Sequence, residues 1–457
     1  MTERHQIHWQ GMYIYVVGVM LLIGIAIRMI GLSKGIWLDE YASINIISAP
    51  DFAQSVKSYD YPPLYFYLLK VWATISIQES FLRTLSVILN LSAVIVFVLW
   101  IKRYSYLASV VAGSLFMTLP VVLRYSHEIQ SYALLLPATA TAFFFASRLS
   151  TDRENFVNHI GLALGLTMAV ATHLVGVILI PTIGLFIILS LPSPRRILSP
   201  GFLISFLIPC IAFALIFFVF LERPSKQDWW MPIPTLEIIS GTAKYVFGWN
   251  ALFWPLPRIQ VYAPYLAIPF DWSIKILTFL YLAALIGFGN WRRSFPLFAA
   301  AFAYWLQMLV ISFLLVPIFW YRTVLPGLIP LVGFVGIQCA TTQRKYIKLF
   351  LVSYTIFLSL YLSVNWIVND ARIPIESWRE TAELLEAQRG TEDIVVFFPD
   401  YAEGPIHYYA DSLAPTNVVN IKPAGELDKL KESIESKNPD YLFLAVCRRG
   451  DFIFVTG

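Results

Sequence analysis

Residues 35–44 read GIWLDEYASI and place two carboxylates, Asp39 and Glu40, directly after the first long apolar run of the chain. A carboxylate in a partly dry site keeps its charge when a cation or hydrogen-bond donor lies near it, and it can then take a proton from an acceptor hydroxyl. The alternative is a solvated loop at a helix end, with Trp37 and Tyr41 as interfacial anchors. The position of the two acids alone leaves both interpretations open.

A second group of ionisable residues lies in RYSHEIQSY, residues 124–132, which contains Arg124, His127 and Glu128. Glu128 could bind a sugar hydroxyl or a metal ion, and Arg124 could pair with a phosphate, because a guanidinium binds phosphate or carboxylate oxygens in bidentate geometry. The alternative is a structural Arg124–Glu128 pair.

Three further residues are candidates for substrate binding. Arg322 lies in WYRTVLPGLIP and could bind phosphate or reach up to lipid headgroups, while His173 in ATHLVGV is more typical of a hydrogen-bonded packing residue. Lys226 lies in the aromatic-rich stretch 222–272, whose rings could stack on sugars, cover a lipid headgroup or rest at the membrane surface.

The composition predicts a multi-pass membrane protein. Of the 457 residues, 58% are hydrophobic and 14% are charged, which is more apolar than a soluble core requires. The three cysteines are scattered without CxxC spacing, so neither a disulfide framework nor a thiolate metal site is indicated. We expect no nucleic-acid partner.

The apolar runs predict about eleven membrane-spanning helices, since one span needs about 20 apolar residues. The first run is read as a retained helix, because no small-residue cleavage pattern follows it. The predicted spans are 12–33, 81–101, 106–123, 131–149, a tight pair within 159–191, 200–221, 273–289, 295–317, 323–340 and 349–368. The short run 62–77 opens with two prolines and is predicted to be an interfacial or re-entrant helix.

Basic residues fix the expected orientation, because Lys and Arg in short loops stay on the cytoplasmic side. With the N-terminus in the cytoplasm, every second loop fits this rule, and the opposite face receives loops 34–80 and 222–272. Ten of the 13 carboxylates of residues 1–368 then fall on the outer side. Charge near a bilayer is costly unless it is paired or wet, so we expect a polar cavity open to the outer face.

The charge balance changes abruptly near residue 369. Residues 1–368 carry a net charge of +11, whereas residues 369–457 carry −7. The second segment also lacks long apolar runs and alternates helix-like stretches (ESWRETAELLEAQ, AGELDKLKESIESK) with strand-like ones (DIVVFFP, TNVVNI, PDYLFLAV). We therefore expect a transmembrane domain over 1–368 and a small soluble α/β domain over 369–457 on the outer face.

Together these motifs resemble the bacterial branch of the GT-C glycosyltransferases, the membrane enzymes related to protein mannosyltransferases and to aminoarabinose transferases. The resemblance covers nearly the whole chain and depends on the order and spacing of its motifs. These motifs are WLDEYAS, YPPLYFYLLK, RTLSVILNLSAV, YSHEIQSYAL, THLVG, YRTVLPGLIP and, near the C-terminus, SWRETAELL, DIVVFFPDY and HYYA.

The resemblance implies transfer of a sugar from a polyprenyl-phosphate donor to a glycolipid, polysaccharide or protein on the outer face of the bacterial plasma membrane. It implies that Asp39 is the catalytic carboxylate, with Glu40 as its neighbour, and that Glu128, His173 and Arg322 match family positions. The chain departs from the pattern at Gln130 and Thr323, where the family usually has Arg and Tyr. Arg124 or Lys226 could compensate in binding the donor phosphate.

Cofactor use and the rival functions stay open at this point. Asp39, Glu40, Glu128 and His173 could hold Mg²⁺ or Mn²⁺, although the resemblance does not require a metal. A transporter or lipid-linked-sugar flippase is the main rival, since polar groups in a helix bundle also mark transport pathways. Ionisable residues are scarce at the predicted helix midpoints, with Arg28 as the clearest exception, which favours the enzyme. A non-catalytic subunit that assembles through its outer domain would be indifferent to changes at Asp39 and Glu128.

Overall fold

The structure is a computed structural model of the whole chain. It describes residues 3–59, 61–152, 155–191, 197, 199–220, 231–247, 264–388, 393–398, 400–410, 418–420, 442–448 and 451–456. The chain divides into two compact units. Unit 1 comprises Met1–Leu32 and Ala49–Ala371, and unit 2 comprises Ser33–Ser48 and Arg372–Gly457. The stretch that carries Asp39 therefore packs with the C-terminal part of the chain, a grouping that the sequence did not indicate.

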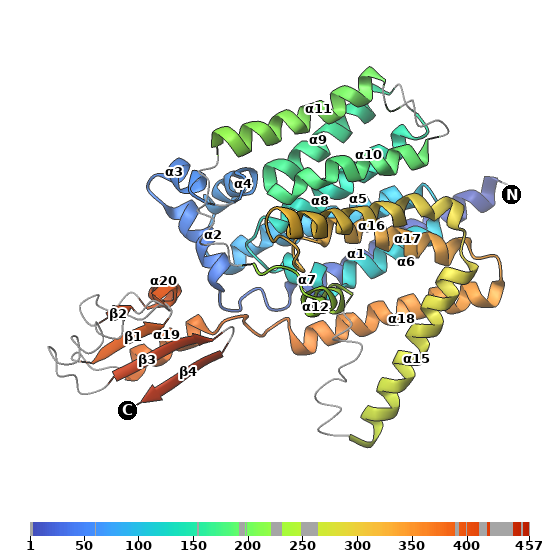
Figure 1. Cartoon of the computed structure of the whole chain (residues 1–457). Coiled ribbons are helices and arrows are strands. Elements are labelled where there is room, and N and C mark those ends of the chain that lie inside the picture. Colours follow the sequence, from blue (N-terminus) through green and yellow to red (C-terminus); the bar gives the residue numbers. More distant parts are fainter. Residues whose placement is uncertain are drawn as a thin grey trace. The chain divides into compact units, whose positions relative to one another are not determined.

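Unit 1 is helical over its described residues (Figure 1). Its α-helices are α1 (Glu3–Met29), α3 (Phe52–Lys57), α4 (Leu64–Ala73), α5 (Glu79–Lys102), α6 (Tyr106–Thr118), α7 (Pro120–Ser126), α8 (Tyr132–Leu149), α9 (Phe156–Thr172), α10 (Leu179–Ser190), α11 (Pro200–Leu215), α12 (Leu236–Val246), α15 (Pro264–Phe288), α16 (Trp291–Leu314), α17 (Leu325–Thr341) and α18 (Lys345–Asn369). A 3₁₀ turn, η1 (Leu174–Ile178), precedes α10, and a π-helical turn, η3 (Ile216–Phe220), follows α11.

Each predicted span coincides with a helix or a pair of consecutive helices, and the short run after residue 62 forms α4. Among the described residues, six helices are long and apolar enough to cross a membrane, and there are seven if the bent pair α6–α7 is one span. The chain is thus a multi-pass membrane protein. The count of about eleven spans stays a prediction, because helices such as α9, α10 and α17 are apolar but shorter.

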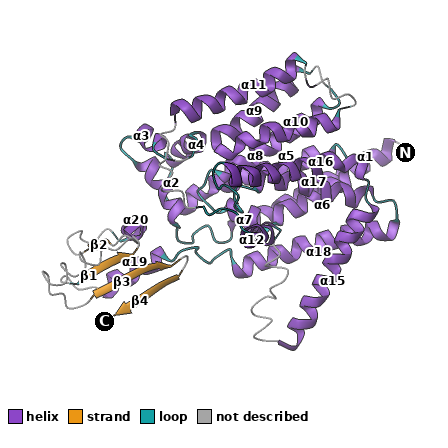
Figure 2. Cartoon of the chain, viewed as in Figure 1, coloured by secondary structure: helices purple, strands orange, loops and turns teal. Residues whose placement is uncertain are grey.

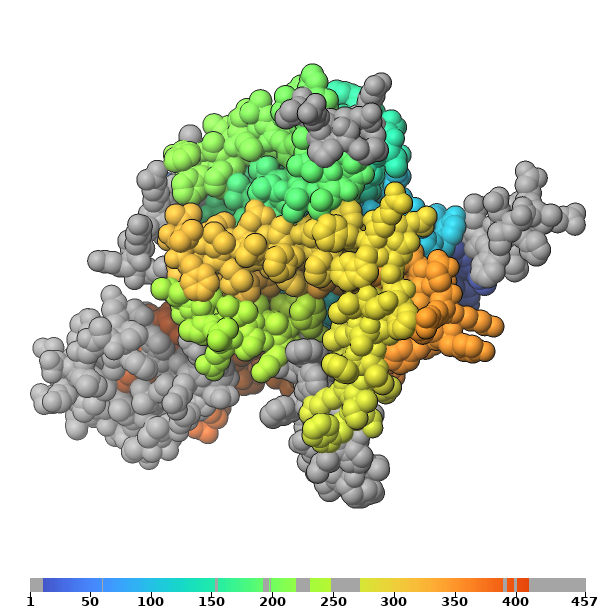
Figure 3. All heavy atoms as spheres, turned by 45° about the vertical axis from the view of Figure 1, so that its right-hand side comes forward, coloured from blue at the N-terminus to red at the C-terminus, as the bar shows by residue number. Residues whose placement is uncertain are grey.

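The core of the bundle is built where small residues let helix backbones approach closely. A Cβ on Gly165 in α9 would lie 2.7 Å from the Ala142 backbone nitrogen in α8, so only glycine allows this approach. Trp100 of α5 is fully buried and stacks on Phe143 of α8, with ring centroids 5.1 Å apart. Outward faces remain apolar: Figure 3 shows α11 in green and α15 in yellow at the surface, and both expose large side chains such as Leu207 and Phe279. Such faces suit contact with lipid.

A break between α6 and α7 bends the chain by 63° just before Arg124. Pro120 has no N–H and begins the new helix, so carbonyl groups around the break lose their helical donors. Arg28 Nη2 donates to the Met117 carbonyl at 2.9 Å and to Asn90 Oδ1 at 2.7 Å, while Asn90 Nδ2 donates to the Val122 carbonyl at 3.0 Å. A fully buried Arg–Asn pair thereby stabilises the bend.

Unit 2 contains the strands of the described chain, coloured orange in Figure 2. Its helical elements are α2 (Leu38–Ser48), α19 (Trp378–Gln388), the 3₁₀ turn η5 (Asp400–Ala402) and α20 (Glu403–Tyr409). Its strands are β1 (Ile394–Phe398), β2 (Val418–Asn420), β3 (Leu442–Arg448) and β4 (Asp451–Thr456), in the order β2-β1-β3-β4. The predicted helix AGELDKLKESIESK lies outside the described residues.

The sheet of unit 2 is mixed, and a small apolar core forms against it. β1 pairs parallel with both β2 and β3 (Val395 opposite Val418 and Phe443), whereas β3 and β4 are antiparallel. Parallel neighbours require crossover connections, which agrees with the helix α20 between β1 and β2. The core consists of Trp378, Ala382, Leu385, Val395, Phe397, Ala402, Ile406 and Ala410. Of these, Trp378 is the largest, and it is fully buried.

Candidate active site

Asp39 and Glu40 lie in the first turn of α2, where their negative charges complement the helix N-terminus. The backbone N–H of Trp37, just before the helix, donates to Glu40 Oε2 at 3.3 Å. A glutamate that reaches back to the N–H of the residue before the helix is half of a capping box. Glu40 is fully buried, whereas Asp39 is partly exposed. The two acids therefore have different environments, and Asp39 is the one accessible for chemistry.

The backbone around Asp39 is held by side chains from the C-terminal part of unit 2. Leu38 N–H donates to Glu376 Oε2 at 2.7 Å, and Ile36 N–H donates to Tyr409 Oη at 2.8 Å. Arg379 Nη1 donates to the Ser33 carbonyl at 2.9 Å. The segment 33–38 is thus fixed through its main chain, by residues more than 330 positions later.

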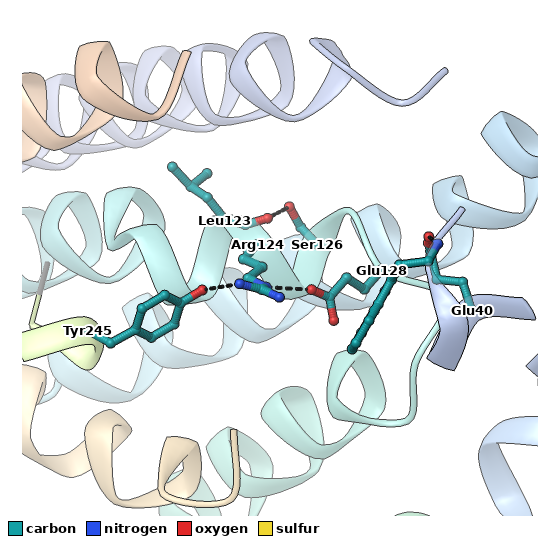
Figure 4. Close-up of polar contacts among 7 residues, drawn as sticks. Glu40, Leu123, Arg124, Ser126, Glu128 and Tyr245 are labelled. Carbon is teal, nitrogen blue, oxygen red and sulfur yellow. Dashed lines mark hydrogen bonds and ion pairs between the residues drawn. The ribbon is translucent and has the colours of Figure 1, made fainter. Parts of the chain in front are cut away.

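In unit 1, Arg124 and Glu128 form a close ion pair, with Nε and Oε1 2.6 Å apart (Figure 4). The two residues are four positions apart, on either side of the C-terminal end of α7. Ser86 Oγ donates a hydrogen bond to the backbone carbonyl of Glu128 at 2.6 Å. The Glu128 side chain is 1% exposed and that of Arg124 is 19% exposed. Their pairing fits the structural alternative considered from the sequence, and it neutralises a carboxylate that could not be buried alone.

Two tyrosines flank the Arg124 guanidinium. Its Nη1 donates to Tyr245 Oη at 2.8 Å, and it lies 5.7 Å from the ring centroids of both Tyr245 and Tyr321. Burial raises the pKa of the Tyr245 phenol, so this hydroxyl stays neutral while it accepts the bond. Aromatic faces stabilise a guanidinium without taking its charge away.

His173 occupies the turn between α9 and η1. Its Nδ1 accepts a hydrogen bond from Val175 N–H at 3.2 Å, which places the ring proton of the neutral imidazole on Nε2, 3.0 Å from Tyr132 Oη. The Tyr61 ring packs edge-on against the imidazole, with centroids 4.9 Å apart. His173 is therefore oriented by a backbone amide and surrounded by tyrosines.

Arg322 is buried beside the same residues. Its charge acts on His173 and on Tyr125, and Tyr125 also experiences the charges of Arg124 and Glu128. Tyr125 and Tyr132 have ring centroids 5.0 Å apart. This contact connects Tyr125, near the Arg124–Glu128 pair, with Tyr132, which contacts His173. We call Tyr125, Tyr132, Tyr245 and Tyr321 the tyrosine cluster. The structure thus brings Arg124, Glu128, His173 and Arg322 together around it.

The sequence reasoning missed the tyrosine cluster as a unit. Tyr125 and Tyr132 lie inside the motif RYSHEIQSY, so a signal was present beside its charged residues. Lys226 lies outside the described residues. Gln130 and Thr323, where the chain departs from the family pattern, are both buried. Thr323 closes the turn before α17, since its hydroxyl donates to the Trp320 carbonyl at 2.9 Å.

A metal site is not preformed in the part of the chain that the structure describes, since no group of three or more His, Cys, Asp and Glu side chains is placed there to hold an ion. The pairing of Glu128 with Arg124 also disfavours a cation at that carboxylate. Asp39 remains a partly exposed carboxylate, and one or two carboxylates suffice for Mg²⁺ only when substrate phosphates and water complete the shell.

Comparison with known proteins was made at three levels. No family model matches the sequence, and no curated protein matches it. Among solved structures, ArnT from Cupriavidus metallidurans in the apo state aligns over 99% of this chain and 98% of its own, with a TM-score of 0.57 and 11% identity. The same protein bound to undecaprenyl phosphate aligns over 96% and 97%, with a TM-score of 0.58 and 11% identity.

The oligosaccharyltransferase of Archaeoglobus fulgidus, in complex with Zn and sulfate, aligns over 93% of this chain and 68% of its own, with a TM-score of 0.53 and 13% identity. The structure of that enzyme tethered to an acceptor peptide gives a TM-score of 0.51 at 11% identity. At these identities the likeness concerns the fold. This chain shares the fold of these two membrane proteins, in agreement with the fold expected from the sequence motifs.

Proposed function

We propose that the protein is a membrane glycosyltransferase that moves a sugar from a polyprenyl-phosphate donor to a glycolipid, polysaccharide or protein acceptor. The observation that carries this proposal is the match with ArnT bound to undecaprenyl phosphate, over 96% of this chain and 97% of that one. The motif residues of the sequence support it, because four of them gather around the tyrosine cluster.

The reaction needs a base more than an acid. The donor sugar leaves with a polyprenyl phosphate, which is a good leaving group and is stabilised by cations rather than by protonation. The acceptor hydroxyl or amine attacks the anomeric carbon while Asp39 takes its proton, and the bond to the phosphate oxygen breaks with its electron pair. Direct displacement of this kind inverts the configuration at the anomeric carbon.

Phosphate binding falls to the arginines of unit 1. Glu128 balances the charge of Arg124, whereas Arg322 adds a positive charge among neutral phenols and a neutral imidazole. A buried guanidinium in such surroundings favours a phosphate oxyanion strongly. Glu128 and His173 then orient Arg124 and Tyr132, and Lys226 is proposed as a further cation for the donor.

The membrane placement follows from the basic loops. We place the N-terminus in the cytoplasm, and unit 2 on the outer face of the bacterial plasma membrane. On that side a lipid-linked donor is the available form of activated sugar, and a nucleotide-binding motif is not needed. A fusion of alkaline phosphatase to the C-terminus should be active, and one to the turn at Arg292 should be inactive.

Metal use is tested within the transfer assay, by comparing donor consumption with and without EDTA. An ion such as Mg²⁺ or Mn²⁺ would supply charge at the donor phosphate, with Asp39 as its protein carboxylate. The paired Glu128 and the capping Glu40 are poorly suited as additional ligands. No step of the transfer above therefore depends on a metal.

The rival transporter or flippase would use polar groups in the middle of the membrane. Arg28, the clearest candidate in the sequence, lies in the last turn of α1 and not at its midpoint, and it binds Asn90 and the carbonyls of Gly24 and Met117. These contacts explain Arg28 as a support for the bend between α6 and α7. The observation disfavours a transport pathway at that position.

The decisive experiment uses the purified full-length protein with a panel of polyprenyl-phosphate sugars, and it measures donor consumption with and without EDTA. We expect one donor to be consumed when the right acceptor extract is added. Absence of consumption with every donor, together with movement of a labelled donor across a vesicle bilayer, would establish the flippase instead.

A further inference from the structure

The segment that carries Asp39 is held mainly through backbone groups. Arg379, Tyr409 and Glu376 bind the Ser33 carbonyl, the Ile36 N–H and the Leu38 N–H, with donor–acceptor distances of 2.7–2.9 Å. Side-chain partners on three backbone groups within six residues fix the path of the chain more firmly than apolar packing alone, because each bond is directional.

Glu376 makes the contact nearest to Asp39. Leu38 is the first residue of α2, so its N–H is one of the helix donors that lack a partner in the helix, and the next residue is Asp39. A carboxylate is a strong acceptor for such a donor, and its charge also suits the positive end of the helix. Glu376 therefore fixes where α2 begins.

Glu376 is itself tied to the core of unit 2. Trp378 Nε1 donates to Glu376 Oε2 at 2.7 Å, the same oxygen that binds Leu38. The Trp378 ring is fully buried in the cluster that includes Val395 and Phe397 of β1. A rigid path thus leads from the sheet through Trp378 and Glu376 to the start of α2.

A second attachment holds the other side of the first turn of α2. The Tyr41 ring packs so closely on α20 that a Cβ on Gly404 would lie 2.7 Å from it, and it meets the Tyr408 ring edge-on at 6.4 Å. Burial, together with the Glu403 carboxylate, raises the pKa of Tyr41, so the phenol stays neutral. Asp39 lies between these two attachments in the sequence.

We propose that Glu376 is a positioning residue for Asp39: the C-terminal domain fixes the catalytic carboxylate by capping the helix on which it lies. This inference rests on the function proposed above. It assigns the domain over residues 372–457 a part in the transfer step, although the sequence offered no chemistry for it. A general base must stay within hydrogen-bond reach of the proton it takes, and a displacement of about 1 Å can cost about 100-fold in rate.

The test compares three variants of the full-length protein in lipid nanodiscs. Glu376→Ala removes the acceptor, Glu376→Gln keeps a carbonyl oxygen for Leu38, and Glu383→Ala changes an exposed glutamate on α19, the helix that begins two residues after Glu376. For each variant, kcat and KM are measured with a polyprenyl-phosphate sugar, and hydrogen exchange is measured in peptides covering 33–41 and 394–398.

We expect Glu376→Ala to lower kcat at least about tenfold, to change KM for the donor less than about threefold, and to speed exchange in 33–41. Exchange in β1 should stay slow, which shows that the domain is folded. Glu376→Gln should recover most of kcat, and Glu383→Ala should resemble the wild type. If Glu376→Ala unfolds β1, Glu376→Asp replaces it as the milder change, because it keeps a carboxylate but shortens the side chain by one methylene, with a smaller loss of kcat expected.

Three results would overturn the inference. They are a kcat within threefold of wild type despite faster exchange, an effect on KM alone, or unchanged exchange in 33–41. If the wild-type protein consumes no donor, the proposed function fails on that result alone. The exchange measurement then still decides whether Glu376 holds the segment, because it does not depend on activity.

Discussion

Two acidic residues of the chain, Glu128 in unit 1 and Asp39 in unit 2, are held in opposite ways. Glu128 is buried with its side chain paired to Arg124 and bordered by phenols, so its charge is balanced where it lies. Asp39 is partly exposed, and it is the backbone before it that is fixed, through Leu38 and Ile36.

The difference agrees with a structural role for Glu128 and with the proposed role of Asp39 as the base. A carboxylate with a cation bound to it has little capacity left to accept a proton, whereas the partly exposed carboxylate of Asp39 is accessible to a substrate. Glu40, next to Asp39, belongs with the first kind, because its side chain caps α2. Neighbouring acids in one motif can therefore have different functions.

Substitution of Asp39 is the most direct test of the contrast between Asp39 and Glu128. Asp39→Asn keeps the shape of the side chain but removes the base, so transfer should fall by about 10³-fold while the protein remains folded. The measurement is donor consumption by purified protein, with size-exclusion elution as the check on folding. Asp51→Asn is the matched control, because Asp51 caps α3 and asparagine caps a helix equally well. Activity of Asp39→Asn near that of the control would contradict the assignment.

In unit 1 the test concerns the ion pair between Arg124 and Glu128. Arg124→Met leaves the buried Glu128 carboxylate without its cation and should lower the free energy of unfolding by about 3 kcal/mol. Adding Glu128→Gln to the same chain should recover part of this loss, because the uncompensated charge is gone. Denaturant titration in micelles measures both, with the exposed Arg103→Met as control. Equal stability of Arg124→Met and wild type would show that the pair is not structural.

The docking of Tyr41 on α20 gives a smaller effect. Gly404→Ala forces the Tyr41 ring to move and should destabilise unit 2 by about 1 to 2 kcal/mol. Hydrogen exchange in the peptide covering α2 should become faster. Gly35→Ala is the control in the same unit, because its added Cβ meets its nearest neighbour at 3.6 Å. If both substitutions speed exchange equally, close packing at Gly404 is not the cause.

The smallest change concerns Glu40. Glu40→Ala removes the cap on Trp37 and should cost about 1 kcal/mol, whereas Glu40→Gln can still accept that N–H. Transfer by Glu40→Gln should stay within about threefold of wild type. A loss as large as that of Asp39→Asn would instead make Glu40 a catalytic partner and remove the contrast between the two acids.

The helices of unit 1 could be predicted from the sequence because apolar runs and basic turns are local signals. The run at 81–101 became α5 with an error of two residues at its start and one at its end. The Arg124–Glu128 pair was also foreseeable, since residues four apart face each other at a helix end. The bend at Pro120 was not predicted, because a single span over 106–123 was equally apolar.

The support of Asp39 could not be predicted from the sequence. Glu376 opens the stretch ESWRETAELLEAQ and reads there as an ordinary exposed residue of a helix start. Its partner Leu38 is 338 residues away, and a side chain that binds a backbone N–H leaves no pattern at the partner's position. The tyrosine cluster was missed for a similar reason: the ring contact of Tyr245 with Tyr321 joins residues far apart in the sequence and depends on how separate segments pack.

The fully buried guanidinium of Arg28 has a consequence for biogenesis. The helix α1 enters the membrane first during synthesis, yet the Asn90 oxygen that Arg28 binds belongs to α5, and the Met117 carbonyl belongs to α6. Arg28 lies in the last turn of α1, and a buried guanidinium in an apolar bundle is costly until it finds such partners. The packing of the first helix is therefore complete only when residues translated some 90 positions later are in place.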